Sequence, residues 1–153
     1  MNMLSRLDVW LGTTLFHPPI ILVCQLTRQS QYALYRALWF FAACHATYYG
    51  LTADKGWLFT IFMWGWVVAT LVNATLHRDR PARSSGFFRC LFWIFFVSGV
   101  AVVPFTGTVT DGTIRALLVL FAEYAATIKT IPPRRKPISS YSAGSERDAP
   151  PIT

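Results

Sequence analysis

Charged residues are scarce in this chain and unevenly distributed. Asp, Glu, Lys and Arg make up 14% of the 153 residues, whereas soluble domains carry about 25%. They are nearly absent from four long runs and crowd the segments between these runs. Together with a hydrophobic content of 54%, this pattern is typical of a membrane protein and not of a soluble domain with a large core.

Acidic residues are the scarcer of the two charge types: seven stand against 14 basic residues, for a net charge of +7. The basic residues flank the apolar runs, where membrane orientation and anionic lipid headgroups account for them. No basic stripe on a folded face can be built. We therefore expect a lipid bilayer and no nucleic acid as partner.

Cysteines and catalytic motifs are also few. The three cysteines, Cys24, Cys44 and Cys90, are odd in number and far apart, which excludes a disulfide framework and a zinc site of the Cys-x-x-Cys type. The sequence contains no nucleophile elbow, Walker loop, glycine-rich dinucleotide fingerprint or His-Glu-x-x-His. We expect a non-enzymatic protein with no cofactor and no metal.

The main positive feature of the sequence is the apolar run of residues 57–76, which contains twenty residues and no charge. A helix of this length is about 30 Å long, which matches the hydrocarbon thickness of a bilayer. Similar runs predict further spans. We expect an all-α integral membrane protein whose residues 37–131 form a four-helix transmembrane bundle, with spans at about 37–51, 57–76, 87–105 and 113–131.

The N-terminal region carries an amphipathic pattern. Leu4, Leu7, Leu11 and Leu15 lie on one face of a helix, which predicts a helix lying in the membrane interface. Pro18-Pro19 should interrupt this helix. Residues 1–36 would then form a cytoplasmic-side interfacial region. The alternative is that residues 7–27 span the membrane with a kink at the prolines, which gives five spans.

The distribution of basic residues favours four spans. Four spans place residues 1–36, 77–89 and 129–153 on one side, and these segments hold 12 of the 14 Lys and Arg. The positive-inside rule then puts both termini in the cytoplasm, and we expect a bacterial cytoplasmic (inner) membrane. Five spans would remove this bias. Residues 132–153, with five of the nine prolines, are predicted to be a disordered basic cytoplasmic tail.

Two ionisable residues fall within predicted spans. Glu123 and His45 lie near the middle of their spans, at similar depth. A carboxylate at this depth costs about 2.5–3.5 kcal/mol, so it should face protein or water. The pair could relay protons. The alternative is a protonated Glu123 bonded to a neighbouring helix, or a Glu123 paired with Arg115 or Lys129, and a neutral buried His45.

Other residues suggest contacts between helices. Asn73 adds a polar group to the second span, and Arg115 adds a charge near one end of the fourth. Gly65 and Ala69 form a small-xxx-small pair that lets another helix approach, and Ala126 shares the face of Glu123. The candidate intramembrane polar site is therefore Glu123, His45, Asn73 and Arg115, and the candidate packing residues are Gly65, Ala69 and Ala126.

Short spans cannot enclose a wide pathway alone, so any pore would need self-association or a partner. We expect a small multi-pass membrane protein that acts by oligomerisation or as an accessory subunit of a larger membrane complex, with a holin-like protein as one example. The alternative is a small transporter or flippase that uses the Glu123–His45 pair.

Overall fold

The computed structural model describes residues 3–53 and 56–129, and this part of the chain is helical with no strand. The prediction of an all-α protein is therefore confirmed. Three segments are long and apolar enough to cross a membrane: Arg6–Thr27, Trp57–Leu76 and Gly86–Thr106. The elements are α1 (Met3–Leu11), η1 (Gly12–Phe16), α2 (His17–Thr27), α3 (Gln31–Thr52), α4 (Trp57–Leu76), α5 (Gly86–Thr106) and α6 (Asp111–Ala125).

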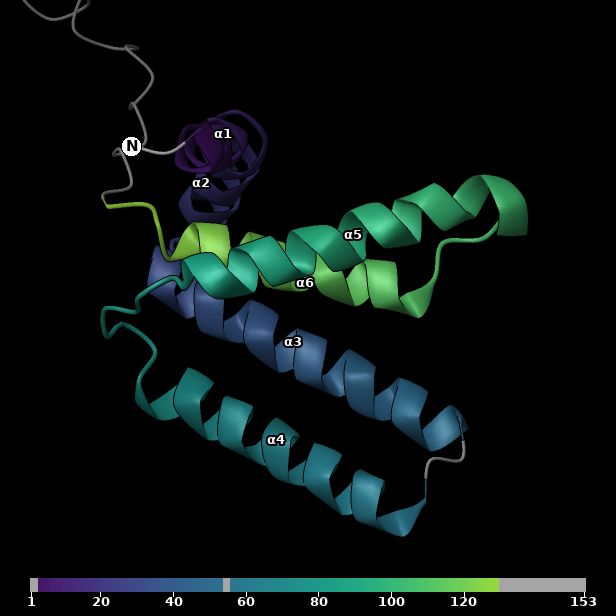
Figure 1. Cartoon of the computed structure of the whole chain (residues 1–153). Coiled ribbons are helices and arrows are strands. Elements are labelled where there is room, and N and C mark those ends of the chain that lie inside the picture. The colour runs from purple at the N-terminus through teal and green to yellow at the C-terminus, as the bar shows by residue number, and fades with distance from the viewer. Residues whose placement is uncertain (1–2, 54–55, 130–153) are drawn as a thin grey trace, which may run out of the picture.

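Four of the helices form a bundle in which α3 and α6 are central (Figure 1). Helix α3 contacts α4 on one side and α6 on the other, and α6 in turn contacts α5. The backbones of the described helices α4 and α5 make no contact with each other. The order in space is therefore α4–α3–α6–α5.

Burial follows this order. Eight residues of α6 are buried, whereas α4 buries only Met63 and Val67 and α5 buries none. The outer helices present large apolar side chains, such as Phe62 and Ile94, to their surroundings. Such a continuous apolar surface is suited to lipid or to another apolar helix, not to water.

The observed helices differ from the predicted spans mainly in the central pair. Helix α4 coincides with the uncharged run 57–76, and α5 extends the run 87–105 by one residue at each end. Helix α3 begins six residues before position 37, because Ser30 caps it by accepting a hydrogen bond from the Ala33 amide. Helix α6 ends at Ala125, six residues before position 131. The tail predicted at 132–153 lies outside the described residues.

The N-terminal helix is continuous, so the predicted interruption at Pro18-Pro19 is wrong. Helices α1 and α2 are joined by the π-helical turn η1, in which the His17 amide donates to the Gly12 carbonyl, five residues earlier. This wider turn gives space to the proline rings, which in an α-helix clash with the carbonyl four residues earlier. Both prolines directly follow this turn, at the beginning of α2.

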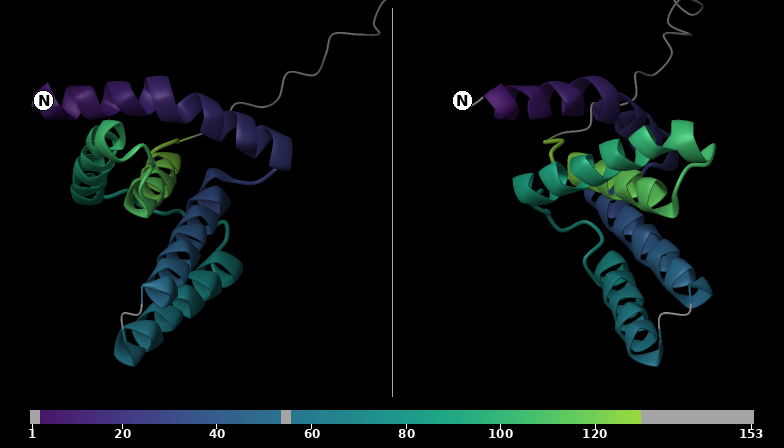
Figure 2. Two further views of the ribbon diagram at one scale, coloured as in Figure 1. Left: turned by 90° about the vertical axis from the view of Figure 1, so that its right-hand side faces the viewer. Right: turned by 45° about the vertical axis from the view of Figure 1, so that its right-hand side comes forward.

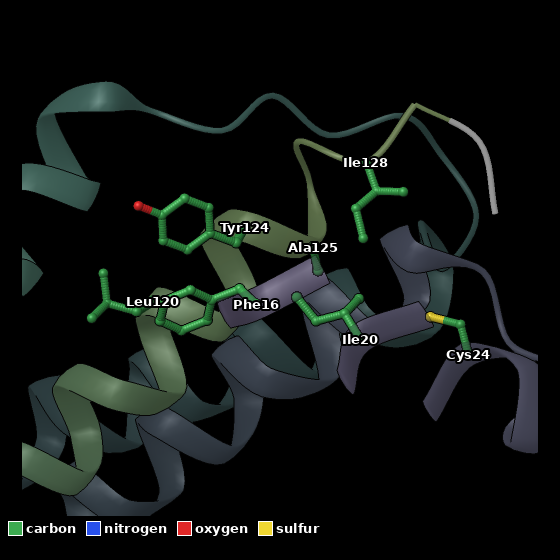
Figure 3. Close-up of a cluster of buried hydrophobic side chains, with 7 residues drawn as sticks. All are labelled: Phe16, Ile20, Cys24, Leu120, Tyr124, Ala125 and Ile128. Atoms are coloured by element: carbon green, nitrogen blue, oxygen red, sulfur yellow. The ribbon is translucent and has the colours of Figure 1, made fainter. Parts of the chain in front are cut away.

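This N-terminal helix runs across the direction of the bundle helices, over the region where α5 begins and α6 ends (Figures 1 and 2). The Phe16 ring stacks on Tyr124 with centroids 4.5 Å apart and meets Phe121 edge-on at 4.9 Å. A Cβ at Gly12 would lie 2.8 Å from the Tyr124 ring, so glycine permits this close approach. The buried cluster around the contact comprises Phe16, Ile20, Cys24, Leu120, Tyr124, Ala125 and Ile128 (Figure 3).

Candidate functional site

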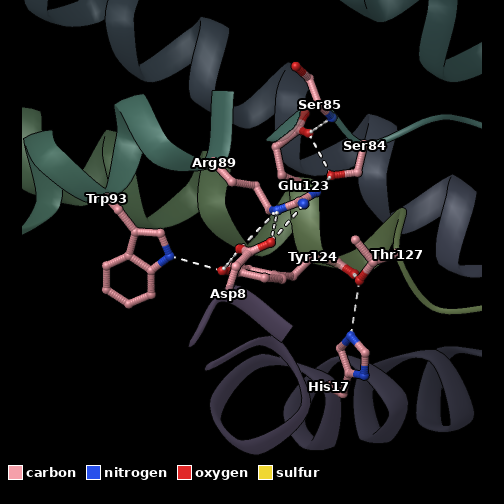
Figure 4. Close-up of polar contacts among 9 residues, drawn as sticks. All are labelled: Asp8, His17, Ser84, Ser85, Arg89, Trp93, Glu123, Tyr124 and Thr127. Carbon is pink, nitrogen blue, oxygen red and sulfur yellow. Dashed lines mark hydrogen bonds and ion pairs between the residues drawn. The ribbon is translucent and has the colours of Figure 1, made fainter. Parts of the chain in front are cut away.

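A polar network joins the N-terminal helix to α5 and α6 (Figure 4). Its centre is the ion pair between Asp8 of α1 and Arg89 of α5. Arg89 Nε lies 3.1 Å from each Asp8 carboxylate oxygen, and Arg89 Nη2 lies 2.8 Å from Asp8 Oδ2. This two-pronged geometry gives strong, directional hydrogen bonds. It therefore fixes α1 against the first turns of α5.

Tyr124 of α6 is the third member of the network. Its hydroxyl donates to Asp8 Oδ1 at 2.7 Å and accepts from Trp93 Nε1 at 2.9 Å. The Arg89 guanidinium also lies over the Tyr124 ring, 5.7 Å from its centroid, where a cation is attracted by the ring face. Three helices are thus connected through one carboxylate and one phenol.

Glu123, the residue next to Tyr124, caps the beginning of α5. The Glu123 side chain is 2% exposed, and Oε2 accepts from the Ser85 amide at 2.8 Å and from the Ser84 hydroxyl at 3.0 Å. Arg89 Nη1 in turn donates to the Ser84 hydroxyl. A carboxylate at a helix N-terminus is favourable because free amides and the helix dipole meet it there.

A second polar cluster lies where α3 begins. Arg36 is 6% exposed and donates to the carbonyls of Tyr32 at 3.2 Å, Arg78 at 3.0 Å and Arg80 at 2.8 Å. Ser30 donates to Asp79 Oδ1 at 2.6 Å. These bonds hold the connection between α4 and α5 against α3.

The structure does not bring Glu123 and His45 together. His45 Nε2 lies 3.8 Å from Asp111 Oδ1 at the beginning of α6, whereas Glu123 is twelve residues further along the same helix. At 1.5 Å per residue this separation is about 18 Å along the axis. Glu123 therefore belongs to the network at one end of the bundle and His45 to the other end.

The other predicted residues lie apart from this network. Asn73, Gly65 and Ala69 are exposed on α4, and a Cβ at Gly65 would meet nothing within 4 Å. Arg115 lies over the Tyr49 ring at 5.8 Å, near the beginning of α6. Ala126 is the residue that follows α6, and its amide bonds to the Ala122 and Tyr124 carbonyls.

Asp8, Arg89, Tyr124, Ser84 and Ser85 were not among the candidates from the sequence. The available signal was the presence of Asp8 and Arg89 in two apolar stretches, because a charge at membrane depth requires a partner. These two residues are 81 positions apart in the sequence, so no local pattern shows that they pair. A groove of about 670 Å³ borders this network and is lined by Leu7, Asp8, Leu11, Gly86, Arg89, Cys90, Trp93 and Val97.

The hydrogen bonds of this network join different elements, because Asp8, Arg89, Glu123 and Tyr124 each bond to a residue of another element. The network therefore holds the helices together. Among residues 3–53 and 56–129, no group of three His, Cys, Asp or Glu could hold a metal ion. Comparison with protein-family models, curated proteins and solved structures finds no match to this chain.

Proposed function

We propose that this chain is a small, non-enzymatic, multi-pass membrane protein that acts by assembly, either with copies of itself or as an accessory subunit of a larger membrane complex. The observation that carries the proposal is the outer face of α4. Met63 and Val67 are buried toward the bundle, and Gly65 and Ala69 lie on the opposite, exposed side.

This face has the chemistry of a helix-packing surface. Small residues four positions apart let two helix backbones approach closely within a membrane. Asn73 continues the same line, is exposed, and has no side-chain hydrogen bond within the described residues. A second helix that carries polar groups at this level would satisfy the amide. Two copies of α4 related by a twofold axis along the membrane normal would bring the Asn73 side chains together.

The placement that we propose is a cytoplasmic inner membrane with both termini inside. The N-terminal helix would lie along the inner interface, which its crossing direction over the bundle supports (Figure 2). Arg89 and Arg36 are located at this end, as the basic bias requires. Reporter fusions after Lys55 and after Asp111 should both be external. A cytoplasmic result at either position would contradict the proposed topology.

The test of assembly compares Ala69→Leu with Ala101→Leu. Ala101 is exposed on α5, so both substitutions add the same bulk to an outer helix, but only Ala69→Leu enlarges the small-residue line. We expect the wild type and Ala101→Leu to have the same mass in detergent by light scattering. Ala69→Leu should shift this mass toward the monomer. Equal masses for all three proteins would exclude α4 as the packing face.

A functional assay separates the two forms of assembly. A holin-like protein should arrest growth and collapse the membrane potential abruptly when its expression is induced, and Ala69→Leu should delay this event. An accessory subunit should leave the potential intact and co-purify with a larger complex. The transporter alternative depended on the Glu123–His45 pair, and no contact among the described residues supports that pair.

A further inference from the structure

The outer helices α4 and α5 flank a groove of about 630 Å³. Its floor is formed by α3 and α6, which contribute Ala46 and Ala116. Its walls are apolar and include Phe59, Met63, Trp66, Phe92, Phe95 and Val102. Ligand pockets in proteins measure about 300–1,000 Å³, so the groove has the size of a small-molecule site.

One cation lines this apolar groove. Arg115 is part of the lining, and its Nε atom is buried without a hydrogen-bond partner. Within the described residues no carboxylate pairs with Arg115, because the nearby Asp111 lies against His45. Arg115 also lies in the second turn of α6, close to the positive end of the helix dipole. The groove thus combines apolar walls with an arginine whose described contact is the Tyr49 ring and not a carboxylate.

We propose that this groove binds an anionic phospholipid, with an acyl chain along the walls and the headgroup phosphate on Arg115. A guanidinium forms charge-assisted hydrogen bonds with phosphate, and a bilayer supplies both the phosphate and the acyl chain. Thr110 and Ser98 also line the groove, and their hydroxyls are bonded within the protein, to Thr113 and to the Ile94 carbonyl.

Charge complementarity favours a lipid over a helix from a second copy. Helices α4 and α5 contain no Asp or Glu, so the outer helices of another copy offer Arg115 no carboxylate. The other acidic residues described above are engaged elsewhere, since Asp8 pairs with Arg89 and Glu123 bonds to Ser84 and Ser85. A phospholipid is therefore the occupant that neutralises the groove.

The test is native mass spectrometry of the purified full chain with phosphatidylglycerol or phosphatidylcholine of identical acyl chains. The wild type should retain phosphatidylglycerol in preference to phosphatidylcholine. Arg115→Gln should weaken phosphatidylglycerol binding by about tenfold, which corresponds to about 1.4 kcal/mol, and Arg115→Lys should restore part of it. Arg83→Gln, which removes an exposed arginine outside the groove, is the matched control and should have no effect.

A second variant tests the groove without changing its charge. Ser98 is exposed in the lining, and Ser98→Phe should reduce the binding of both lipids by filling the space for the acyl chain. Equal binding by Arg115→Gln and Arg83→Gln would overturn the proposal. So would a loss of self-association, without loss of lipid, in Ser98→Phe, which would place a second copy in the groove. Ala69→Leu should leave lipid binding unchanged, so this test is independent of assembly through α4.

Discussion

The central pair of helices and the outer pair differ in where their polar residues lie. All five buried polar or charged residues of the described chain are in α3 or α6: Gln31, Arg36, Thr47, Thr113 and Glu123. Helices α4 and α5 bury none and expose their apolar residues. Of these four helices, only α4 and α5 are long and apolar enough to be recognised as spans by length and composition.

The difference between the two pairs shows that hydropathy reports whether a helix lies on the outside or at the centre of a small helical bundle. A helix that faces lipid must be apolar around most of its surface, because unsatisfied polar groups are costly there. A helix enclosed by others can carry polar groups that bond to its neighbours, as Arg36 and Glu123 do. Low hydropathy in α3 and α6 is therefore consistent with a central position.

The largest expected effect comes from Glu123, a buried polar residue of the central helix α6. Glu123→Leu removes both hydrogen bonds to the beginning of α5, and we expect the free energy of unfolding in detergent to fall by about 3 kcal/mol. Glu123→Gln keeps an acceptor and should cost less. Denaturant titration followed by tryptophan fluorescence measures both. Equal losses would show that the volume of the side chain and not its hydrogen bonds matters.

A smaller effect on the free energy of unfolding is expected from alanine substitutions at two glycines of the outer helices. A Cβ at Gly99 of α5 would overlap the Thr113 side chain of α6, so Gly99→Ala should lower the free energy of unfolding by about 2 kcal/mol. Gly65→Ala adds the same methyl group to open space on α4 and should raise the free energy of unfolding by up to about 1 kcal/mol, because alanine favours a helix over glycine. The same titration, performed on the monomer, compares them. A cost at Gly65 as large as that at Gly99 would contradict the described packing.

The smallest effect concerns the link from the outer helix α5 to the N-terminal helix. A double-mutant cycle with Asp8→Asn and Arg89→Gln should give a coupling energy of about 1 kcal/mol, because the Asp8 side chain is 30% exposed. A cycle with Asp8→Asn and Arg83→Gln should give none. Zero coupling in the first cycle would show that the ion pair does not hold α1 in place.

The sequence predicted the outer helices better than the central ones, for a physical reason. Residues 57–76 contain no charge and no proline, so the run and α4 coincide. The end of α6 depends on Thr127, whose hydroxyl bonds to the Tyr124 carbonyl at 2.6 Å and competes with the helical hydrogen bond. The beginning of α3 depends on the Ser30 cap. Local apolar character does not reveal either feature.

The candidate site was harder to predict, because its contacts join distant parts of the chain. The sequence suggested a neighbouring helix, Arg115 or Lys129 as a partner of Glu123, whereas its side chain bonds to Ser84 and Ser85, in a connection that the sequence shows only as polar. Its assignment to mid-span depth rested on a helix extending to 131, and the helix ends at Ala125. The pairing of Asp8 with Arg89 requires the N-terminal helix to fold back over the bundle, which no local pattern indicates.

The π-helical turn at Gly12–Phe16 also sets the rotational phase between the two halves of the N-terminal helix. Positions 8, 12, 16, 20 and 24 are four apart, and in an α-helix of 3.6 residues per turn they would drift by about 1.6 residues from first to last. The extra residue of the turn offsets most of this drift, so Asp8 meets Arg89 while Ile20 and Cys24 remain in the core. Deleting one residue of this turn would rotate α1 by about 100° relative to α2. Asp8 would then no longer face Arg89, although the amphipathic composition of α1 would be unchanged.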